Sequence, residues 1–168
     1  MYKTFFKSPL GNLVIIVDKG NLVYCNWDDE DCLTKLKRTE REISEKSSSE
    51  EDKVVATLVL CQLKEYFSGK RERFQLPLNP YGSPFKKEVW YKLCETGYGA
   101  KISYKELGEK CGRANAVRAV ANACGANPLA VVVPCHRVIR SDGTMGGYTG
   151  GLWRKEKLLG LESGTPIK

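Results

Sequence analysis

The chain has 168 residues, which is enough to bury the core of one ordinary domain or of a small domain joined to a larger one. A hydrophobic content of 42%, a charged content of 28% and a net charge of +7 indicate a soluble globular protein and exclude a disordered or membrane-spanning one. The seven cysteines include no C-x-x-C pair and no secretory signal is visible, so we expect reduced thiols, no metal site and an intracellular protein.

The first 27 residues predict a three-stranded antiparallel sheet. Three β-rich runs are separated by turn sequences at residues 8–11 and 18–21. Short turns of this kind join neighbouring antiparallel strands.

The charged stretch 28–52 predicts no core element. Its serine-rich end, residues 44–52, is typical of a mobile surface loop. Asp52 is then expected to cap an apolar helix that ends at Gly69 and packs on the sheet. These elements form a predicted N-terminal α/β domain over residues 1–75.

A proline-containing linker over residues 76–83 separates this domain from a predicted C-terminal domain over residues 84–168. The charge balance changes at the linker: residues 1–83 carry 13 Lys and Arg against 13 Asp and Glu, and residues 84–168 carry 14 against 7. A neutral half joined to a basic half indicates that the basic half binds a polyanion such as nucleic acid. Composition alone leaves open a basic protein without such a partner.

The second half is predicted to be mainly helical. Ser83 and Pro84 are typical of the start of a helix. The buried stripe of that helix is predicted to contain Phe85, Val89, Trp90 and Leu93.

Residues 103–125 predict two short helices joined by a tight turn. Ser103 and Glu106 have the spacing of a capping box, and this helix should stop at Gly112. Asn115 is expected to cap a second helix that Gly125 closes. The pair is a candidate helix-turn-helix motif.

The second of these helices offers small side chains and one long cation. Arg118 is its only charged residue, among Ala116, Ala119, Ala121 and Ala123. Small residues suit close approach to a shallow groove, in which Arg118 would act as a probe. The alternative is a buried alanine-rich helix with Arg118 at its edge.

The segment "VVVPCHRVIR" contains the only histidine, His136, next to Cys135. The apolar run 129–133 predicts a buried strand or extended segment, and Pro134 ends it rigidly before the cysteine. A nucleophilic cysteine must be deprotonated, and His136 is the nearest base.

Geometry complicates this pairing, because adjacent residues of an extended chain point to opposite sides. A water between Cys135 and His136 would connect them, with an acid orienting the imidazole. The acids close in sequence are Asp142, Glu156 and Glu162.

Other cysteine chemistries fit less well. A zinc deaminase requires a second cysteine three residues after Cys135, and a papain-like hydrolase requires a separate histidine far along the chain. A buried structural thiol stays open on composition alone.

Several ordered motifs together resemble the O6-alkylguanine-DNA alkyltransferase family, the methylated-DNA–protein-cysteine methyltransferases. They are "SPLGNLVI", "LKEYFSGK", "PFKKEVW", "SYKELGEKCG", "AVRAVANACGANP", "PCHRVI", "GGYTGG" and "KEKLLGLE". The resemblance covers nearly the whole chain and implies an α+β fold. The implied fold has an N-terminal domain like ribonuclease H, with a three-stranded antiparallel sheet and a helix. Its C-terminal domain is mainly helical and contains a helix-turn-helix.

The resemblance implies direct reversal of DNA damage. Cys135 matches the nucleophile that irreversibly takes the alkyl group from O6-alkylguanine, or from O4-alkylthymine, after the base flips out of the duplex toward the pocket. Glu162 and His136 match a relay that reaches Cys135 through a water. Tyr104 matches the residue that helps protonate the leaving guanine. Because the product is a thioether, each molecule should react once.

The resemblance also assigns the binding residues. Arg118 matches an arginine finger that fills the gap left by the flipped base, and Asn127 matches a hinge between the recognition helix and the active-site segment. Minor-groove contacts fall on Ala116, Ala119, Arg113, Lys105 and Ser141. The guanine pocket falls on Val138, Tyr148 and Thr149.

The implied partner is double-stranded DNA with an alkylated guanine, without a cofactor or a membrane, and we expect a monomer. The location would be the cytoplasm of a prokaryote, or the nucleus and cytoplasm of a eukaryote. The zinc site of some family members should be absent, because His136 is the only histidine. Cys124 stands where other members place a bulkier residue near the alkyl pocket, so the preferred alkyl group is open. The glycines at 146, 147, 150 and 151 suggest a pliable pocket wall that admits groups larger than methyl.

Two other classes stay in view. A DNA-binding module or damage sensor without catalysis would lack the nucleophile, and Cys135 argues against it. A cysteine hydrolase of small molecules is disfavoured by the single histidine and by Arg118.

Overall fold

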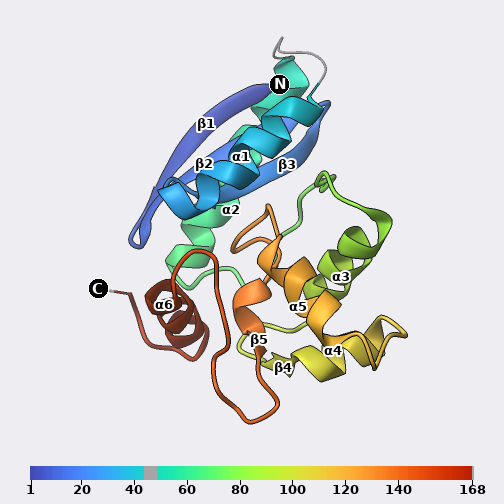
Figure 1. Cartoon of the computed structure of the whole chain (residues 1–168). Coiled ribbons are helices and arrows are strands. Elements are labelled where there is room, and N and C mark those ends of the chain that lie inside the picture. Colours follow the sequence, from blue (N-terminus) through green and yellow to red (C-terminus); the bar gives the residue numbers. More distant parts are fainter. Residues whose placement is uncertain (44–48, 168) are drawn as a thin grey trace.

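The computed structural model describes residues 1–43 and 49–167, and confirms an α+β fold (Figure 1). The first half contains the antiparallel sheet β1 (Tyr2–Ser8), β2 (Gly11–Asp18) and β3 (Asn21–Trp27), in that order. The turn between β2 and β3 has positive φ at both central residues, Lys19 and Gly20, which matches the twist of a two-residue hairpin. The predicted sheet is therefore confirmed.

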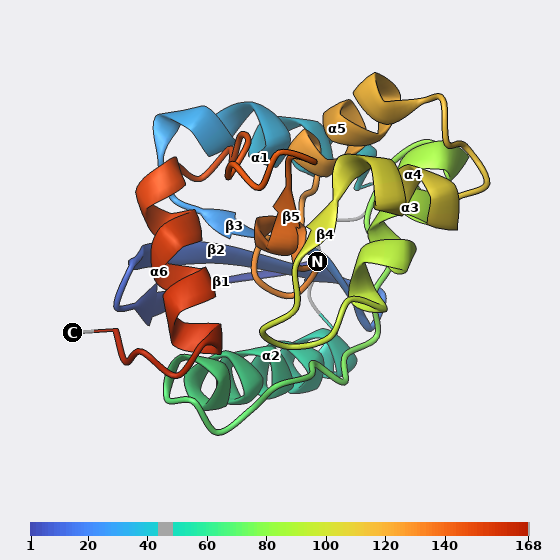
Figure 2. The same ribbon diagram turned by 90° about the horizontal axis from the view of Figure 1, so that it is seen from below.

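The sheet lies between two helices, one on each face (Figure 2). Helix α2 (Glu50–Phe67) packs on the face that carries Leu13, Ile15 and Val17 of β2. Helix α1 (Glu30–Glu42) packs on the opposite face, where Val14 and Ile16 are buried. Strand alternation places neighbouring β2 residues on opposite faces, so both faces of this strand are covered.

Helix α1 was not predicted, because its composition is strongly polar. Its buried residues nevertheless recur at helical spacing, at Cys32, Leu36 and Thr39, with Ile43 just after its end. One narrow apolar stripe was enough to attach a charged helix to the sheet.

The start of α2 also differs from the prediction. Ser49 is the N-cap, and Asp52 is the third helical residue, whose side chain accepts from the backbone N–H of Ser49 in a capping box. The predicted loop 44–52 was therefore wrong for residues 50–52, which are helical. The loop prediction for residues 44–48 lies outside the described residues.

The second half contains α3 (Pro84–Cys94), α4 (Tyr104–Lys110) and α5 (Val117–Gly125) on one side and α6 (Leu152–Glu162) on the other (Figures 1 and 2). A short parallel pair, β4 (Ile102–Ser103) and β5 (Val138–Ile139), lies between them.

The predicted helix starts are confirmed for α3 and α4, but not for α5. Ser83 accepts a hydrogen bond from the Lys86 N–H, and the Ser103–Glu106 capping box is formed. The residue that precedes α5 is Ala116, not Asn115, and no side chain caps this helix. Helices α4 and α5 are joined by a turn in which Gly112 has φ 65°, so the predicted helix-turn-helix is present.

The two halves meet along the free edge of β3. The Leu22 N–H donates to Pro77 and the Cys25 N–H donates to Pro128, so two segments of the second half and linker pair with this strand. The second of these segments leads directly to Cys135. The N-terminal sheet thus anchors the chain just before the candidate nucleophile.

Residues 129–133 are buried as expected, but the predicted strand was wrong. The segment folds into a turn closed by the Val133 N–H and the Leu129 carbonyl, 2.8 Å apart, and only Leu129 bridges to β3. Val131 has φ 71°, a conformation that is rare for a β-branched residue. An apolar run cannot by itself distinguish a strand from a buried turn.

Candidate active site

A cavity of about 400 Å³ lies between α5, the start of α4 and the glycine-rich loop before α6. Cys135 lines it together with Tyr104, Tyr148 and Thr149. Asn26 and Lys35 of the N-terminal half complete one wall. Most of the predicted pocket residues therefore share one cavity with the cysteine.

Cys135 is delivered by a sharp bend and not by an extended chain. Residues Cys135–Arg137 form one turn of 3₁₀-helix, in which the Arg137 N–H donates to the Pro134 carbonyl at 3.0 Å. Cys135 is half-buried at the cavity and His136 is fully buried behind it. The two side chains therefore lie in different surroundings. The sequence predicted this separation from an extended chain, whereas the structure produces it with a turn.

Asn127 ties the end of α5 to the cysteine. Its side-chain amide donates to the Val133 carbonyl at 3.0 Å and to Cys135 Sγ at 3.1 Å. The backbone carbonyl of Asn127 accepts hydrogen bonds from the side chains of Asn26 and Lys35, across the boundary between the two halves. This buried side chain fixes the position of the thiol relative to α5.

The surroundings of the thiol have opposing electrostatic effects. Burial raises the pKa of Cys135, while the hydrogen bond from Asn127 and the positive charges of Lys35 and Lys155 act to lower it. Because burial dominates, the thiol needs a base to become a thiolate at neutral pH.

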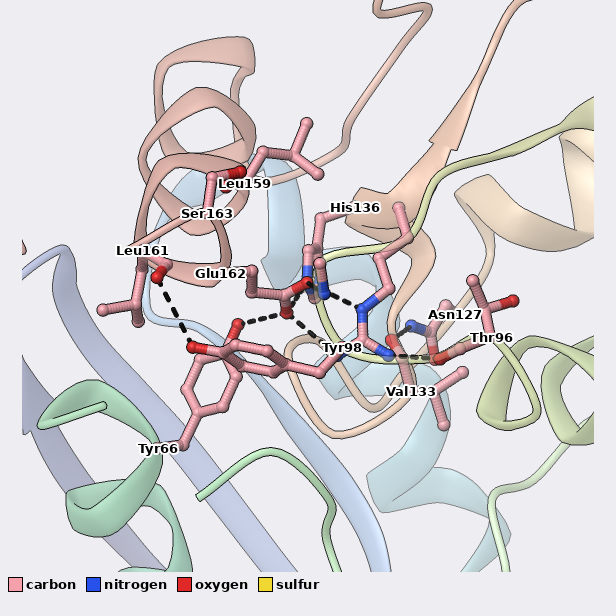
Figure 3. A network of polar contacts seen from close by, with 12 residues as sticks. Tyr66, Thr96, Tyr98, Asn127, Val133, His136, Leu159, Leu161, Glu162 and Ser163 are labelled. Atoms are coloured by element: carbon pink, nitrogen blue, oxygen red, sulfur yellow. Dashed lines mark hydrogen bonds and ion pairs between the residues drawn. The ribbon is translucent and has the colours of Figure 1, made fainter. Parts of the chain in front are cut away.

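His136 and Glu162 form a buried pair, with His136 Nε2 and Glu162 Oε1 2.7 Å apart (Figure 3). Burial lowers the pKa of His136, against the influence of Glu162, so the imidazole is neutral at neutral pH. The short contact places the imidazole proton on Nε2 and leaves Nδ1 as an acceptor. Among the described residues Nδ1 has no hydrogen-bond partner.

Glu162 is the centre of a larger network. Arg137 binds it through Nε at 2.8 Å and Nη2 at 2.9 Å, the Tyr66 hydroxyl donates to it at 2.7 Å, and the Gly99 N–H donates at 3.1 Å. Burial alone would raise the pKa of this carboxyl, but the hydrogen bonds and charges of His136 and Arg137 hold it well below its usual range. Glu162 is therefore a permanent anion.

The glycines near the pocket serve close packing. A Cβ at Gly150 would overlap the indole of Trp27, whose N–H donates to the Tyr148 hydroxyl at 3.4 Å. At Gly146, which has φ 61°, a Cβ would lie 3.1 Å from the Tyr104 ring. At these two positions the absence of a side chain lets Tyr148 and Tyr104 pack close to the backbone of the loop. These glycines therefore serve close packing, whereas the sequence predicted that they make the pocket wall pliable.

Val138 lies outside the cavity lining. It is fully buried, and its carbonyl accepts from the Lys155 ammonium, which also donates to the carbonyls of Met145 and Gly147. Lys155 is completely buried and was missed at the sequence level, where it looked like one more basic residue of α6. It joins β5 to the loop that forms the pocket wall.

Lys155→Met should lower the free energy of unfolding by about 2 kcal/mol, because the carbonyls of Val138, Met145 and Gly147 lose their shared donor and the first of them is buried. Hydrogen exchange in the loop around Gly147 should also become faster. Lys157→Met, at an exposed position of the same helix, is the control and should change neither. Equal stability of the two variants in urea would contradict the role of Lys155.

The helix-turn-helix presents a mostly unobstructed surface. On α5, Val120, Ala123 and Cys124 are buried, while Arg118 and Ala119 are exposed; Ala116, just before the helix, is half-buried. This excludes the alternative of a fully buried alanine-rich helix. Lys105 and Ser141 are also exposed.

Arg113 differs from the other predicted DNA contacts. Its guanidinium lies 3.5 Å from Glu88 and 5.1 Å from the centre of the Phe85 ring. It is half exposed, so this surface ion pair is weak and can be exchanged for another anion.

Two further observations concern membrane-spanning helices and metal sites. In residues 1–43 and 49–167, no helix is long and apolar enough to cross a membrane. Within the same ranges, no three His, Cys, Asp or Glu side chains gather as a metal site would require.

Known proteins match this chain over nearly its full length. Residues 1–80 match the family domain described as "6-O-methylguanine DNA methyltransferase, ribonuclease-like domain", and residues 84–164 match "6-O-methylguanine DNA methyltransferase, DNA binding domain". A "Methylated-DNA--protein-cysteine methyltransferase" of Methanosarcina barkeri is 40% identical over 162 residues, which cover 96% of this chain and 97% of the relative. One of the same name from Haemophilus influenzae is 33% identical and covers 96% and 86%.

Solved structures agree with these matches. The crystal structure of Mycobacterium tuberculosis OGT in complex with DNA has a TM-score of 0.81 and 30% sequence identity, covering 99% of this chain and 96% of that one. The structure titled as the O6-methylguanine methyltransferase of the same organism has a TM-score of 0.80, also at 30% identity, and covers 98% and 93%.

Proposed function

Because the chain belongs to the 6-O-methylguanine DNA methyltransferase family, it repairs DNA by transferring an alkyl group from guanine O6 to one of its own cysteines, and we propose that this cysteine is Cys135. One observation carries the choice. Cys135 lines the cavity at the start of a short turn whose second residue, His136, is bound to the permanent anion Glu162. Cys124 lines the same cavity, but lies on α5 without such a neighbouring base.

The thiol proton leaves first. His136 Nδ1 is the acceptor, through a water that bridges it to Cys135 Sγ, and Glu162 stabilises the imidazolium that forms. The amide of Asn127 and the ammonium groups of Lys35 and Lys155 favour the thiolate over the thiol.

The thiolate then attacks the alkyl carbon in line with the bond to guanine O6. The S–C bond forms, the C–O6 bond breaks and its electron pair stays on the base. The Tyr104 hydroxyl lines the cavity, and burial raises its pKa, so it is protonated at neutral pH and can give its proton to the departing base, which leaves as neutral guanine. The proton held on His136 then returns to Tyr104 through solvent, so that both side chains end neutral. A thioether has no hydrolytic route back to the thiol, so each molecule reacts once.

The base reaches the cavity by leaving the stack, because O6 of a paired guanine is out of reach of a side chain. Ala116 and Ala119 would lie against the minor groove, with Lys105, Arg113 and Ser141 on the strand and Arg118 inserted in the duplex. Tyr148 and Thr149 would hold the flipped base, with O4-alkylthymine as a second substrate. We propose that the protein acts as a monomer, with Asn127 as the hinge between α5 and the thiol.

Mass spectrometry of the protein after incubation with duplex DNA that contains O6-methylguanine tests this proposal. The tryptic peptide with Cys135 should gain one methyl in place of a proton. Cys135→Ala should gain none, while Cys124→Ala, which removes the other cavity thiol, should still be methylated at Cys135. Tight binding of the damaged duplex without any adduct would instead identify a sensor, and an adduct on Cys124 would overturn the assignment.

A further inference from the structure

Tyr66 brings the N-terminal half into contact with the buried network behind Cys135. It lies near the end of α2, is fully buried, and its hydroxyl donates to Glu162 Oε1 at 2.7 Å (Figure 3). Glu162 ends α6, 96 residues further along the chain. The contact therefore joins two helices of different halves at the carboxylate that holds His136.

The direction of the Tyr66 hydroxyl is fixed by the packing of its ring. Phe67 and Tyr98 meet the ring edge-on, with centroids 5.4 and 6.2 Å away, and Phe74 lies tilted at 5.4 Å. A ring held on three sides cannot turn its hydroxyl away without disturbing the core. The donor is thus a permanent part of the site.

Three donors share one oxygen of the carboxylate. Glu162 Oε1 accepts from Tyr66, from His136 Nε2 and from Arg137 Nη2, while Oε2 accepts from Arg137 Nε and the Gly99 N–H. Each donor stabilises part of the negative charge and leaves less of it to stabilise a proton on His136. The two bonds from Arg137 orient the carboxylate by themselves, so the hydroxyl of Tyr66 is not needed for its placement.

We propose that Tyr66 is a positioning residue for alkyl transfer, whose hydroxyl competes with His136 for Glu162 Oε1 and so keeps the imidazole neutral and ready to accept the thiol proton. The inference rests on the proposed function, because it assigns the proton to His136. It also gives the N-terminal half a part in the chemistry that its distance in sequence from the cysteine does not suggest.

The charged and titratable groups that face His136 are contributed by three elements. Glu162 and Lys155 belong to α6, and Arg137 belongs to the turn of His136 itself. Tyr66, from α2, acts through Glu162, and Tyr98 contacts the same network. Replacing Tyr66 removes a neutral donor and leaves every one of these charges in place. The pKa of His136 should therefore change in one direction only, upward.

The test compares Tyr66→Phe with Tyr98→Phe. The two tyrosines touch within one aromatic cluster, but the Tyr98 hydroxyl donates to the Leu161 carbonyl at 3.4 Å and not to the carboxylate. The first-order rate of methyl transfer from duplex DNA is measured with protein in saturating excess, from about pH 5 to about pH 9. Tyr66→Phe should move the midpoint of the acid limb upward by about half to one pH unit and leave the alkaline plateau within about twofold of wild type. Tyr98→Phe should not move the midpoint.

Two results would overturn the inference. One is a midpoint in Tyr66→Phe equal to that of wild type. The other is a rate reduced by the same factor at every pH, as expected from loss of packing alone. Failure of the proposed function is a separate outcome, because wild-type protein would then form no Cys135 adduct. The titration of the imidazole by NMR needs no transfer, and His136 is the only histidine in the chain, so its pKa in the two variants is measured in either case.

Discussion

Glu162→Gln is expected to slow alkyl transfer to Cys135 by about 100-fold or more and to lower the free energy of unfolding by about 3–5 kcal/mol. Glutamine has the same shape as glutamate but carries no charge. Its amide oxygen can accept from one or two of the five donors that now surround the carboxylate. Its NH₂ group would face another N–H, from either Arg137 or His136.

The stability loss comes mainly from Arg137. Its side chain is 7% exposed, and within residues 1–43 and 49–167 Glu162 is the only carboxylate at ion-pair distance from it. Without the anion, a buried guanidinium retains its charge but loses its partner, which costs more than breaking a surface ion pair. The loss of transfer comes from His136, because a neutral amide cannot stabilise the imidazolium that takes the thiol proton.

The effect of Glu162→Gln on stability depends on pH. The pKa of Glu162 is lower in the folded protein than its ordinary value of 4.5, so the carboxylate contributes stability above that value and loses it as the pH falls further. The difference in unfolding free energy between wild type and Glu162→Gln should therefore be largest near neutral pH and shrink below about pH 4.5.

Chemical denaturation at a series of pH values measures this difference. Glu156→Gln, at an exposed position of the same helix, removes the same charge and should leave both stability and transfer within error of wild type. A Glu162→Gln protein that transfers methyl groups at the wild-type rate would contradict the relay, whatever its stability.

The sequence was most informative where structure is local. The sheet was predicted from turns that join adjacent strands. The helix-turn-helix was predicted from a capping box whose two residues, Ser103 and Glu106, are three positions apart. Helix α1 was missed because the residues described as buried along it, Cys32, Leu36 and Thr39, lie within a polar stretch and do not raise its average hydrophobicity. Asn115 has the right chemistry for an N-cap, yet α5 starts after Ala116, where the turn from α4 ends.

The site shows the same division between local and distant information. Cys135 and His136 are neighbours, and their chemistry is visible in a short motif. Tyr66, Lys35 and Asn26 lie about 70 to 110 residues before the cysteine, and their positions depend on how α2, α1 and β3 pack against the second half. No spacing rule connects such residues, because the contact depends on the tertiary fold. Lys155 escaped notice since burial of a lysine cannot be read from its neighbours.

Arg118→Ala is expected to slow transfer from duplex DNA by about 30-fold or more, and to change the reaction with free O6-benzylguanine by less than about twofold. Extrusion of a base costs a few kcal/mol of stacking and pairing, and a side chain that fills the gap repays part of this cost. Arg118 is exposed on α5, on the side of the helix away from its buried residues, and it is not one of the residues that line the cavity. A free base needs no extrusion, so the pocket should treat it alike with or without Arg118.

Arg113→Ala is the matched control, because it removes one positive charge from the same helix pair. The ion pair of Arg113 with Glu88 is exposed, so the guanidinium is free to contact a phosphate instead. Removing Arg113 should therefore weaken DNA binding and reduce the salt dependence of affinity, but leave the rate of transfer from bound duplex unchanged. Rates measured with protein in saturating excess separate the two effects. If Arg118→Ala slowed the free base as much as the duplex, the substitution would act on the pocket and not on base extrusion. If both variants lost only affinity, Arg118 would be a phosphate contact and the base would leave the stack without its help.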